Sequence, residues 1–371
     1  MPGRLLIQMF VLFRLAATAT AFAQPSSHDP RVDQLAKEVR YKGWIVYSAR
    51  TDKDDWDLFL IRPNGSSRRS ITNTSEFSEM GGRFSPDGKR LLYRRLPKGS
   101  TFAHDKWGIQ GQLIIANSDG TNPVIIGGMG EFPWASWSPD GKQIACLDKD
   151  GIKIYELATK KEVRRMDRKG IYQQFFWSPD GKWFCGPANQ YGQGWGVVRM
   201  NINTGVVNSV SETKSCCTPD WFPDSRHIVY SYRPSNQEVI DNGEMARRAG
   251  QKLEHGWTQL WMADAEGKGS LVYGEDGCHI YGGAISPDSQ YVLFTRSYEE
   301  DLKVMGMVAH PLGSKKRGAP MALMRLSDAP TIGGESKALR KLHPRTKDGP
   351  LLQLPECWEP HWTYADIGIK R

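Results

Sequence analysis

Phe176-Trp177-Ser178-Pro179-Asp180-Gly181-Lys182 is the stretch that decides the fold, because it recurs along the chain. Pro fixes φ in a type I turn, Ser and Asp cap the turn locally, and Gly takes the left-handed position that follows. An apolar strand on each side makes the motif a β-hairpin corner. One copy predicts only a turn, whereas five copies predict a repeat. The other copies are residues 83–89 and 136–142 and, more loosely, 221–225 and 285–289.

The spacing of the copies predicts the repeating unit. The turn prolines are 53, 40, 44 and 64 residues apart, and a four-stranded propeller blade needs roughly 40–50 residues. The 13 Trp, 13 Tyr and 13 Phe residues, with frequent Gly and Pro, suit short strands joined by tight turns. The longer intervals contain insertions, at residues 96–111, 187–195, 233–258 and 298–319. The sequence therefore predicts a β-propeller.

The two chain ends decide the number of blades. The first strand pair, residues 44–47 and 57–61, has no turn motif ahead of it, so its innermost strand is missing at the N-terminus. Residues 359–364 match the run before the other turns, with Trp362 in the aromatic position. Pairing of this segment with the first strand closes the ring and removes its open edges. We therefore predict an all-β, six-bladed β-propeller over residues 44–366, closed by its N-terminal and C-terminal strands.

The repeat resembles that of the TolB-like propellers, whose WD-like motif reads aromatic-Ser-Pro-Asp-Gly-Lys. The resemblance spans residues 44–366 and is specific for architecture more than for activity. TolB itself carries an additional N-terminal domain, for which the segment ahead of Trp44 is too short.

The N-terminus is typical of an export signal. Arg4 precedes a nearly apolar run over residues 5–13, and Ala21-Phe22-Ala23 gives the pattern for cleavage before Gln24. Arg14 interrupts the apolar stretch, and an uncleaved membrane anchor, for which the run is short, is the alternative. Cleavage lowers the formal net charge from +8 to +6. We expect a signal peptide over residues 1–23, an N-terminal lead-in over 24–43, a C-terminal tail over 367–371, and a periplasmic or secreted bacterial protein.

The face opposite the turn motifs is the expected binding surface, because the insertions gather there and function concentrates on loops held by a rigid scaffold. Carboxylate, imidazole, guanidinium and aromatic groups at the channel mouth suit a sugar-like or peptide-like ligand. Each of them can equally satisfy buried backbone or fill a water-lined channel. The candidate residues are Glu79, Arg83, Trp134, Tyr172, Gln174, Asp220, His279, Tyr281, Trp358, Glu359 and His361.

Histidines supply a second hypothesis for this face. Three converging imidazoles make a transition-metal site, and some propeller polysaccharide lyases resembling oligogalacturonate lyases use such a set. No HxH or HExxH spacing occurs, so no cofactor is predicted, and a transition metal or Ca²⁺ in the channel is the alternative. The histidines expected on this face are His104, His255, His279 and His361.

Six cysteines without a CxxC motif permit disulfides in an exported protein. Cys278 and Cys357 both lie just before inner strands, in blades that adjoin across the closure. We therefore expect a Cys278–Cys357 disulfide.

Sequence motifs of common enzymes are missing: there is no GxSxG nucleophile elbow, P-loop or Rossmann fingerprint. No aromatic residues alternate with basic ones as in nucleic-acid platforms. We therefore expect a monomeric, non-enzymatic module that binds a protein or glycan at its top face, binds no nucleic acid, and contacts a membrane only through an uncleaved signal. The alternative is a polysaccharide-acting enzyme, lyase- or hydrolase-like, with His279, His361 and Glu359 at the channel mouth.

Overall fold

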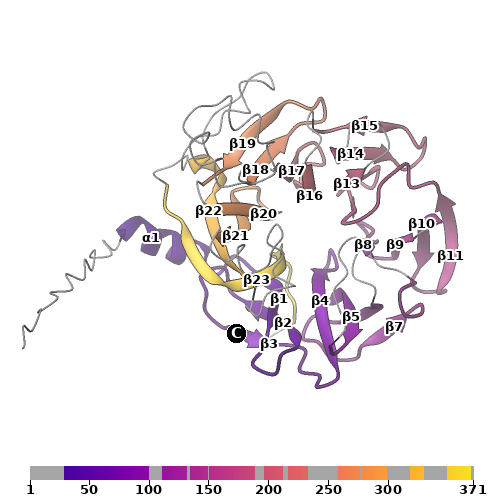
Figure 1. The fold of residues 1–371 in the computed structure, drawn as a ribbon, viewed down its shortest axis with the longest axis horizontal. Helices are drawn as coiled ribbons and strands as arrows, with labels where there is room; N and C mark the ends of the chain where they lie inside the picture. Colours follow the sequence, from indigo (N-terminus) through magenta and orange to yellow (C-terminus); the bar gives the residue numbers. More distant parts are fainter. Residues whose placement is uncertain are drawn as a thin grey trace, which may run out of the picture.

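The computed structural model describes residues 29–99, 111–131, 134–148, 150–188, 196–211, 216–232, 258–275, 278–298, 318–329 and 349–368. Nearly all regular structure in these ranges is β, and the sheets follow one another around a central axis to form a ring (Figure 1). The protein is therefore a β-propeller, as predicted. One α-helix, α1 (Pro30–Val39), is present in the described ranges and lies at the outside of the ring.

Four sheets are antiparallel and four-stranded, with the first strand of each nearest the centre (Figure 1). We number them as blades 2 to 5. Blade 2 consists of β4 (Phe77–Phe84), β5 (Arg90–Pro97), β6 (Gln112–Asn117) and β7 (Val124–Ile126). Blade 3 consists of β8 (Trp134–Trp137), β9 (Gln143–Asp148), β10 (Gly151–Glu156) and β11 (Lys161–Met166). Blade 4 consists of β12 (Phe176–Trp177), β13 (Trp183–Ala188), β14 (Gly196–Asn201) and β15 (Val207–Ser209). Blade 5 consists of β16 (Cys216–Trp221), β17 (Ile228–Tyr232), β18 (Gln259–Ala263) and β19 (Gly269–Tyr273).

The fifth sheet has seven strands and contains both chain ends. Its long strand β23 (Leu352–Thr363) first pairs with β22, where Cys357 faces Ala319, and then with β1, where Trp362 faces Ile45. One strand is thus the outer strand of blade 6 and the inner strand of blade 1. This confirms the predicted closure and gives six blades, although the outer-strand role of residues 352–357 was not expected. The order is β20 (Cys278–Ile285), β21 (Tyr291–Tyr298), β22 (Ala319–Arg325), β23, β1 (Trp44–Arg50), β2 (Trp56–Ile61) and β3 (Arg69–Ser70).

The turn motif forms the hairpin corners for the reasons expected from its chemistry. In blade 3 the Ser138 hydroxyl donates to Asp140 Oδ1 at 2.6 Å and accepts the Gln143 N–H at 2.9 Å. The Asp140 carboxylate also accepts the Lys142 N–H at 3.0 Å, and Gly141 follows with φ of 66°. Self-contained hydrogen bonding lets the same corner recur in blades 2, 3, 4 and 6.

In blades 3 and 5 the tryptophan two before the turn proline is hydrogen-bonded to the neighbouring blade, whereas Trp177 of blade 4 donates to Gly181 of its own turn. Trp137 Nε1–H donates to the Arg83 carbonyl of blade 2 at 3.1 Å, and Trp221 Nε1–H donates to the Phe176 carbonyl of blade 4 at 3.0 Å. Their rings are buried in the apolar layers between sheets, which form the core. The aromatic residue therefore supplies both apolar contact and a buried donor with a defined acceptor.

Helix α1 covers the closure. Asp29 caps it by accepting the Arg31 N–H at 2.9 Å. Leu35 and Val39 are fully buried in the cluster that joins blades 6 and 1. The Glu38 carboxylate binds Arg325 of β22 at 2.6 Å. Part of the predicted lead-in is therefore a structural element of the ring.

Residues 1–28 lie outside the described residues, and with them the predicted signal peptide and its cleavage site. Across the described part of the chain, none of the helices combines the length and apolarity needed to span a bilayer.

The expected Cys278–Cys357 disulfide is not formed, because all six cysteines are thiols. Cys278 is buried in the apolar layer between blades 5 and 6, whereas Cys357 is buried in the layer between blades 6 and 1. The sequence placed the two residues in adjoining blades, but it did not indicate that different apolar layers would bury them.

Candidate ligand-binding site at the centre of the ring

One position in or just before each inner strand lies three residues before the aromatic or apolar residue of the turn motif, and in five of the six blades its backbone is unusual. We call these six positions the upper ring: Gly81, Trp134, Gln174, Thr218, Gly282 and Glu359. Five of them are left-handed, with φ of 67° at Gly81, 39° at Gln174, 49° at Thr218, 60° at Gly282 and 48° at Glu359. In β4, β16, β20 and β23 the pairing register also shifts here, as at a β-bulge.

Three of the left-handed residues are not glycines, and this has an energetic cost. A non-glycine residue pays about 1–2 kcal/mol in this conformation, because its Cβ crowds the following carbonyl. Gln174, Thr218 and Glu359 therefore carry backbone strain at the same level of the ring. Strain of this kind clusters at ligand sites and switch regions.

A second level lies two residues nearer the turns, and we call it the lower ring: Arg83, Ser136, Phe176, Asp220, Ala284 and His361. Arg83 Nη1 of blade 2 is 2.7 Å from Asp220 Oδ2 of blade 5. These blades are opposite in a ring of six, so the ion pair crosses its centre. The Arg83 guanidinium also stacks 4.1 Å from the centre of the Phe176 ring.

Glu359 makes a second crossing contact at the upper ring. Its Oε2 accepts from Arg94 Nη2 of β5 at 2.5 Å, and its Oε1 accepts from Gln174 Nε2 of blade 4 at 3.3 Å. Arg94 is only 4% exposed, and its guanidinium lies 4.0 Å from the centre of the Trp134 ring. Burial lowers the pKa of Arg94 from its ordinary value, and the Glu359 carboxylate opposes this shift. The pair is therefore a largely desolvated charge pair, in which losing either partner is costly.

Gly81 makes room for this ion pair. A Cβ at this position would lie 2.4 Å from Arg94 Nη2 and 2.5 Å from Glu359 Oε2. The backbone N–H of Gly81 donates to the Ser48 hydroxyl at 3.0 Å, which fixes the bulge. A side chain here would force both ends of the ion pair to move, and the positive φ also favours glycine.

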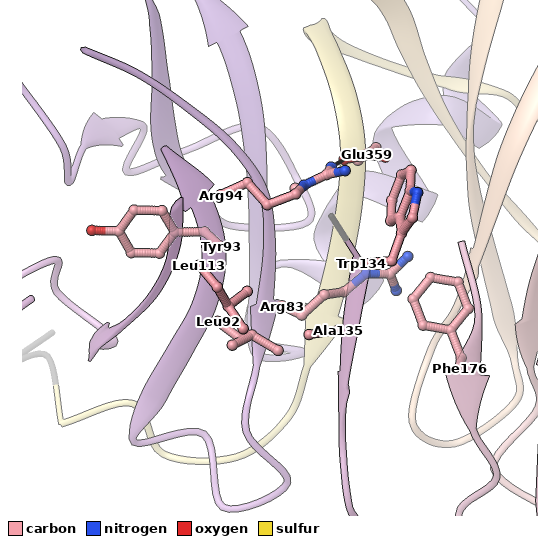
Figure 2. A pocket seen from close by; sticks show the side chains of 10 residues that line it. Arg83, Leu92, Tyr93, Arg94, Leu113, Trp134, Ala135, Phe176 and Glu359 are labelled. Carbon is pink, nitrogen blue, oxygen red and sulfur yellow. Dashed lines mark hydrogen bonds and ion pairs between the residues drawn. The ribbon is translucent and has the colours of Figure 1, made fainter. Parts of the chain in front are cut away.

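These side chains surround a hollow with an empty volume of about 340 Å³, part of it open to solvent. Figure 2 shows Arg94 extending toward Glu359, with Trp134 below them and Arg83 directed toward Phe176. The hollow thus has two guanidinium groups, each beside an aromatic ring and each paired with a carboxylate. It is lined by Gly81, Arg83, Leu92, Tyr93, Arg94, Leu113, Trp134, Ala135, Phe176 and Glu359.

The structure brings together five of the predicted site residues: Arg83, Trp134, Gln174, Asp220 and Glu359. Sequence reasoning missed Gly81, Arg94 and Phe176. Aligning the turn motifs would have found Gly81 and Phe176, because they occupy upper-ring and lower-ring positions. No sequence signal indicates Arg94, which is on a second strand and reaches the centre only because Gly81 leaves space.

Comparison with known proteins supports this architecture. No protein-family model matches the chain, and no curated protein matches it. Among solved structures, TolB from Acinetobacter baumannii is similar with a TM-score of 0.56 and 15% identity, over 89% of this chain and 69% of that one. A putative TolB from Agrobacterium tumefaciens is similar with a TM-score of 0.50 and 19% identity, over 77% and 87%. The fold is a TolB-like β-propeller. An oligogalacturonate lyase from Vibrio parahaemolyticus matches with a TM-score of 0.44 and 11% identity, over 80% and 72%, which carries no argument about activity.

Two of the four predicted histidines lie in the described residues, and both accept backbone hydrogen bonds. His361 Nδ1 accepts the Phe84 N–H at 3.0 Å, and His279 Nδ1 accepts the Thr258 N–H at 3.1 Å. Desolvation of the His361 imidazole and the nearby Arg83 guanidinium hold its pKa well below its usual range. Both residues thus satisfy backbone donors. In the described ranges no three His, Cys, Asp or Glu side chains are arranged to hold a metal, and His104 and His255 lie outside those ranges.

Four further predicted residues of the TolB-like propeller lie apart from the hollow. Glu79 is 1% exposed and accepts from Thr74 Oγ1 at 2.8 Å. Trp358 is buried in an apolar cluster with Trp56. Tyr281 stacks on His279 with ring centres 6.3 Å apart. Burial raises the pKa of Tyr172 well above its usual range.

Proposed function

We propose that this chain is an exported, non-enzymatic binding module that takes a protein segment or a glycan at the upper ring. The observation that carries the proposal is the contact between Gln174 and Glu359, two strained residues from opposite blades. Packing alone gives no reason to place strained polar residues there, because glycine takes this conformation freely at Gly81 and Gly282. Retention of strain at a polar hollow is typical of a binding site.

Substitution of Gln174 by glycine tests this proposal. Gln174→Gly relieves the backbone and removes the amide that the proposal assigns to the ligand at the upper ring, so we expect an unchanged or higher melting temperature together with lost binding. Arrays of immobilised peptides and of immobilised glycans, probed with the labelled protein, measure binding to many candidate ligands at once. Lys142→Ala and Lys182→Ala, beside the turns at the other end of the inner strands, are the controls. Loss of binding in the controls but not in Gln174→Gly would refute the proposed site.

A polysaccharide-acting enzyme is the second candidate, favoured by one observation. Burial raises the pKa of Glu79 to about 7, within the range useful to a general acid or base. Against it, Glu79 is 1% exposed and lies apart from the hollow. Metal analysis of the purified protein separates the candidates: a stoichiometric transition metal that is lost in the His279→Ala/His361→Ala double variant would favour the enzyme.

Export is the third part of the proposal and rests on the charged, apolar and small-residue pattern of residues 1–23. Mass spectrometry of the N-terminus after expression in a bacterium tests it. A mature chain that begins at Gln24 is the expected result, and an intact N-terminus in the cytoplasmic fraction would contradict it.

A further inference from the structure

We infer that Glu359 occupies the position of a ligand carboxylate, and that the ligand is an acidic peptide segment whose Glu or Asp side chain displaces Glu359 from Arg94. The inference rests on the proposed function and names the chemistry of its ligand. It follows from the environment of Arg94, the position of Glu359 in the hollow and the indole of Trp134.

Arg94 is arranged to hold a carboxylate. One face of its guanidinium lies on the Trp134 ring at 4.0 Å, which leaves the N–H groups at its edge for acceptors. Its side chain is 5% exposed, so removal of the Glu359 carboxylate takes the counter-charge from a buried cation, which is costly. A ligand that separates Arg94 from Glu359 therefore has to supply an anion in its place.

Glu359 is the carboxylate that lines the hollow, so it is the one that a ligand entering there has to replace. It is held with φ of 48°, whereas Asp220, the partner of Arg83, is not among the residues with positive φ. The left-handed backbone of Glu359 belongs to the inner strand, because Gly81 and Gly282 share it without an ion pair, so the ligand carboxylate has to compensate Arg94 in full. The Arg83–Asp220 pair lies one level lower and stays intact beneath the ligand.

Trp134 supplies a second donor at the same place. Its side chain is 7% exposed, and its Nε1–H has no hydrogen-bond acceptor among the described residues. A buried indole N–H normally has an acceptor. A carboxylate or peptide carbonyl of the ligand satisfies it, so the hollow offers a charged donor and a neutral donor together.

The dimensions of the hollow favour a peptide side chain over a sugar ring. Its present occupant is a glutamate side chain, and the lining residues Leu92, Tyr93 and Trp134 are buried, so the space between them is narrow. A slender carboxylate side chain can follow the path of Glu359, whereas a pyranose ring is bulkier. The formal net charge, +8 for the full chain and +6 after cleavage before Gln24, also attracts an acidic partner at long range.

Titration of the full chain with fluorescein-labelled hexaglutamate tests the inference, with affinity measured by fluorescence anisotropy. Glu359→Gln keeps the shape and removes the competing carboxylate, so it should bind at least tenfold tighter than wild type. Arg94→Gln should abolish binding in both backgrounds. Glu38→Gln removes a carboxylate from an arginine pair on α1, outside the hollow, and should bind like wild type. Melting temperatures confirm that each variant is folded, and hexaglutamine should not bind.

Two outcomes would overturn the inference. One is equal affinity of wild type and Glu359→Gln for hexaglutamate, or binding that persists in Arg94→Gln. The other is Arg94-dependent binding of a glucuronate oligosaccharide without binding of hexaglutamate, which would assign the hollow to a glycan. In either case, array binding that still depends on Gln174 would continue to support the proposed binding module. The acidic-peptide inference can therefore fail while the proposed function stands.

Discussion

At the scale of single residues, the centre of the ring combines buried charge with backbone strain. The two ion pairs and the Gln174–Glu359 contact join blades that are far apart in sequence. Each depends on a local backbone feature, since Gly81 leaves space for Arg94 and Glu359 reaches Gln174 from a left-handed conformation. The chemistry of the hollow is thus tied to the bulges of the inner strands.

Gly81→Ala tests the role of close approach. The new Cβ displaces the Arg94–Glu359 pair in addition to straining the backbone, so we expect a loss of unfolding free energy larger than the roughly 1–2 kcal/mol of strain alone, measured by urea denaturation. Gly282→Ala is the matched control, because Gly282 occupies the same upper-ring position with φ of 60° and has nothing within 4 Å of a Cβ. Its cost should be limited to backbone strain. Equal losses in the two variants would show that the ion pair is not displaced.

Glu79 predicts a pH dependence of stability. Burial raises its pKa from 4.5 to about 7, so the folded protein retains a proton that the unfolded chain has lost. The stabilisation is complete below pH 4.5 and disappears as the pH rises through 7, a change of roughly 3 kcal/mol. Glu79→Gln should remove this part of the decrease in unfolding free energy between pH 4.5 and 7. Urea denaturation at several pH values measures it. Asp366→Asn, an exposed control, should keep the wild-type slope, and an unchanged slope in Glu79→Gln would exclude Glu79 as its source.

At the scale of elements, α1 and β23 show how the two chain ends stabilise one ring. Trp362 Nε1–H donates to the Lys42 carbonyl at 2.7 Å, and Lys42 Nζ binds Asp288 of the blade 6 turn at 2.9 Å. The segment between α1 and β1 therefore contacts both β23 and blade 6. Helix and strand close the same junction from opposite ends of the sequence.

Leu35→Ala tests the contribution of α1. Leu35 is fully buried among residues of blades 1 and 6, so truncation leaves a cavity and should cost about 2–5 kcal/mol in unfolding free energy. Val163→Ala on β11 is the control: Val163 is 50% exposed and its truncation should cost less than about 0.5 kcal/mol. If α1 contributed little to the core, the loss of unfolding free energy would be similarly small in both variants.

At the scale of the whole molecule, the six blades form a closed ring because β23 belongs to both blade 6 and blade 1. Closure pairs the strand edges that would otherwise remain open and prone to association. It also sets opposite blades at a fixed distance across the centre, which the Arg83–Asp220 pair requires. The candidate site also depends on closure directly, because Glu359 and His361 lie in the part of β23 that pairs with β1.

Deletion of residues 358–371 tests closure. The truncation keeps the part of β23 that pairs with β22 and removes the part that pairs with β1. We expect an insoluble or strongly destabilised product, measured as soluble yield and melting temperature. Deletion of residues 369–371 alone is the control and should change neither. A soluble 358–371 deletion with the wild-type melting temperature would contradict closure by β23.

The fold could be predicted from the sequence because turn chemistry and strand alternation are local and repeat at a readable spacing. The motif around Pro179, the aromatic position and the unmatched segment at residues 359–364 were enough to predict six blades and their closure. Which polar residues meet at the centre is instead a property of the folded ring. Arg83 and Asp220 are 137 positions apart, and Arg94 and Glu359 are 265 apart. Such pairs form because ring closure and inner-strand bulges set both position and direction of the side chains, and neither property is encoded in local spacing.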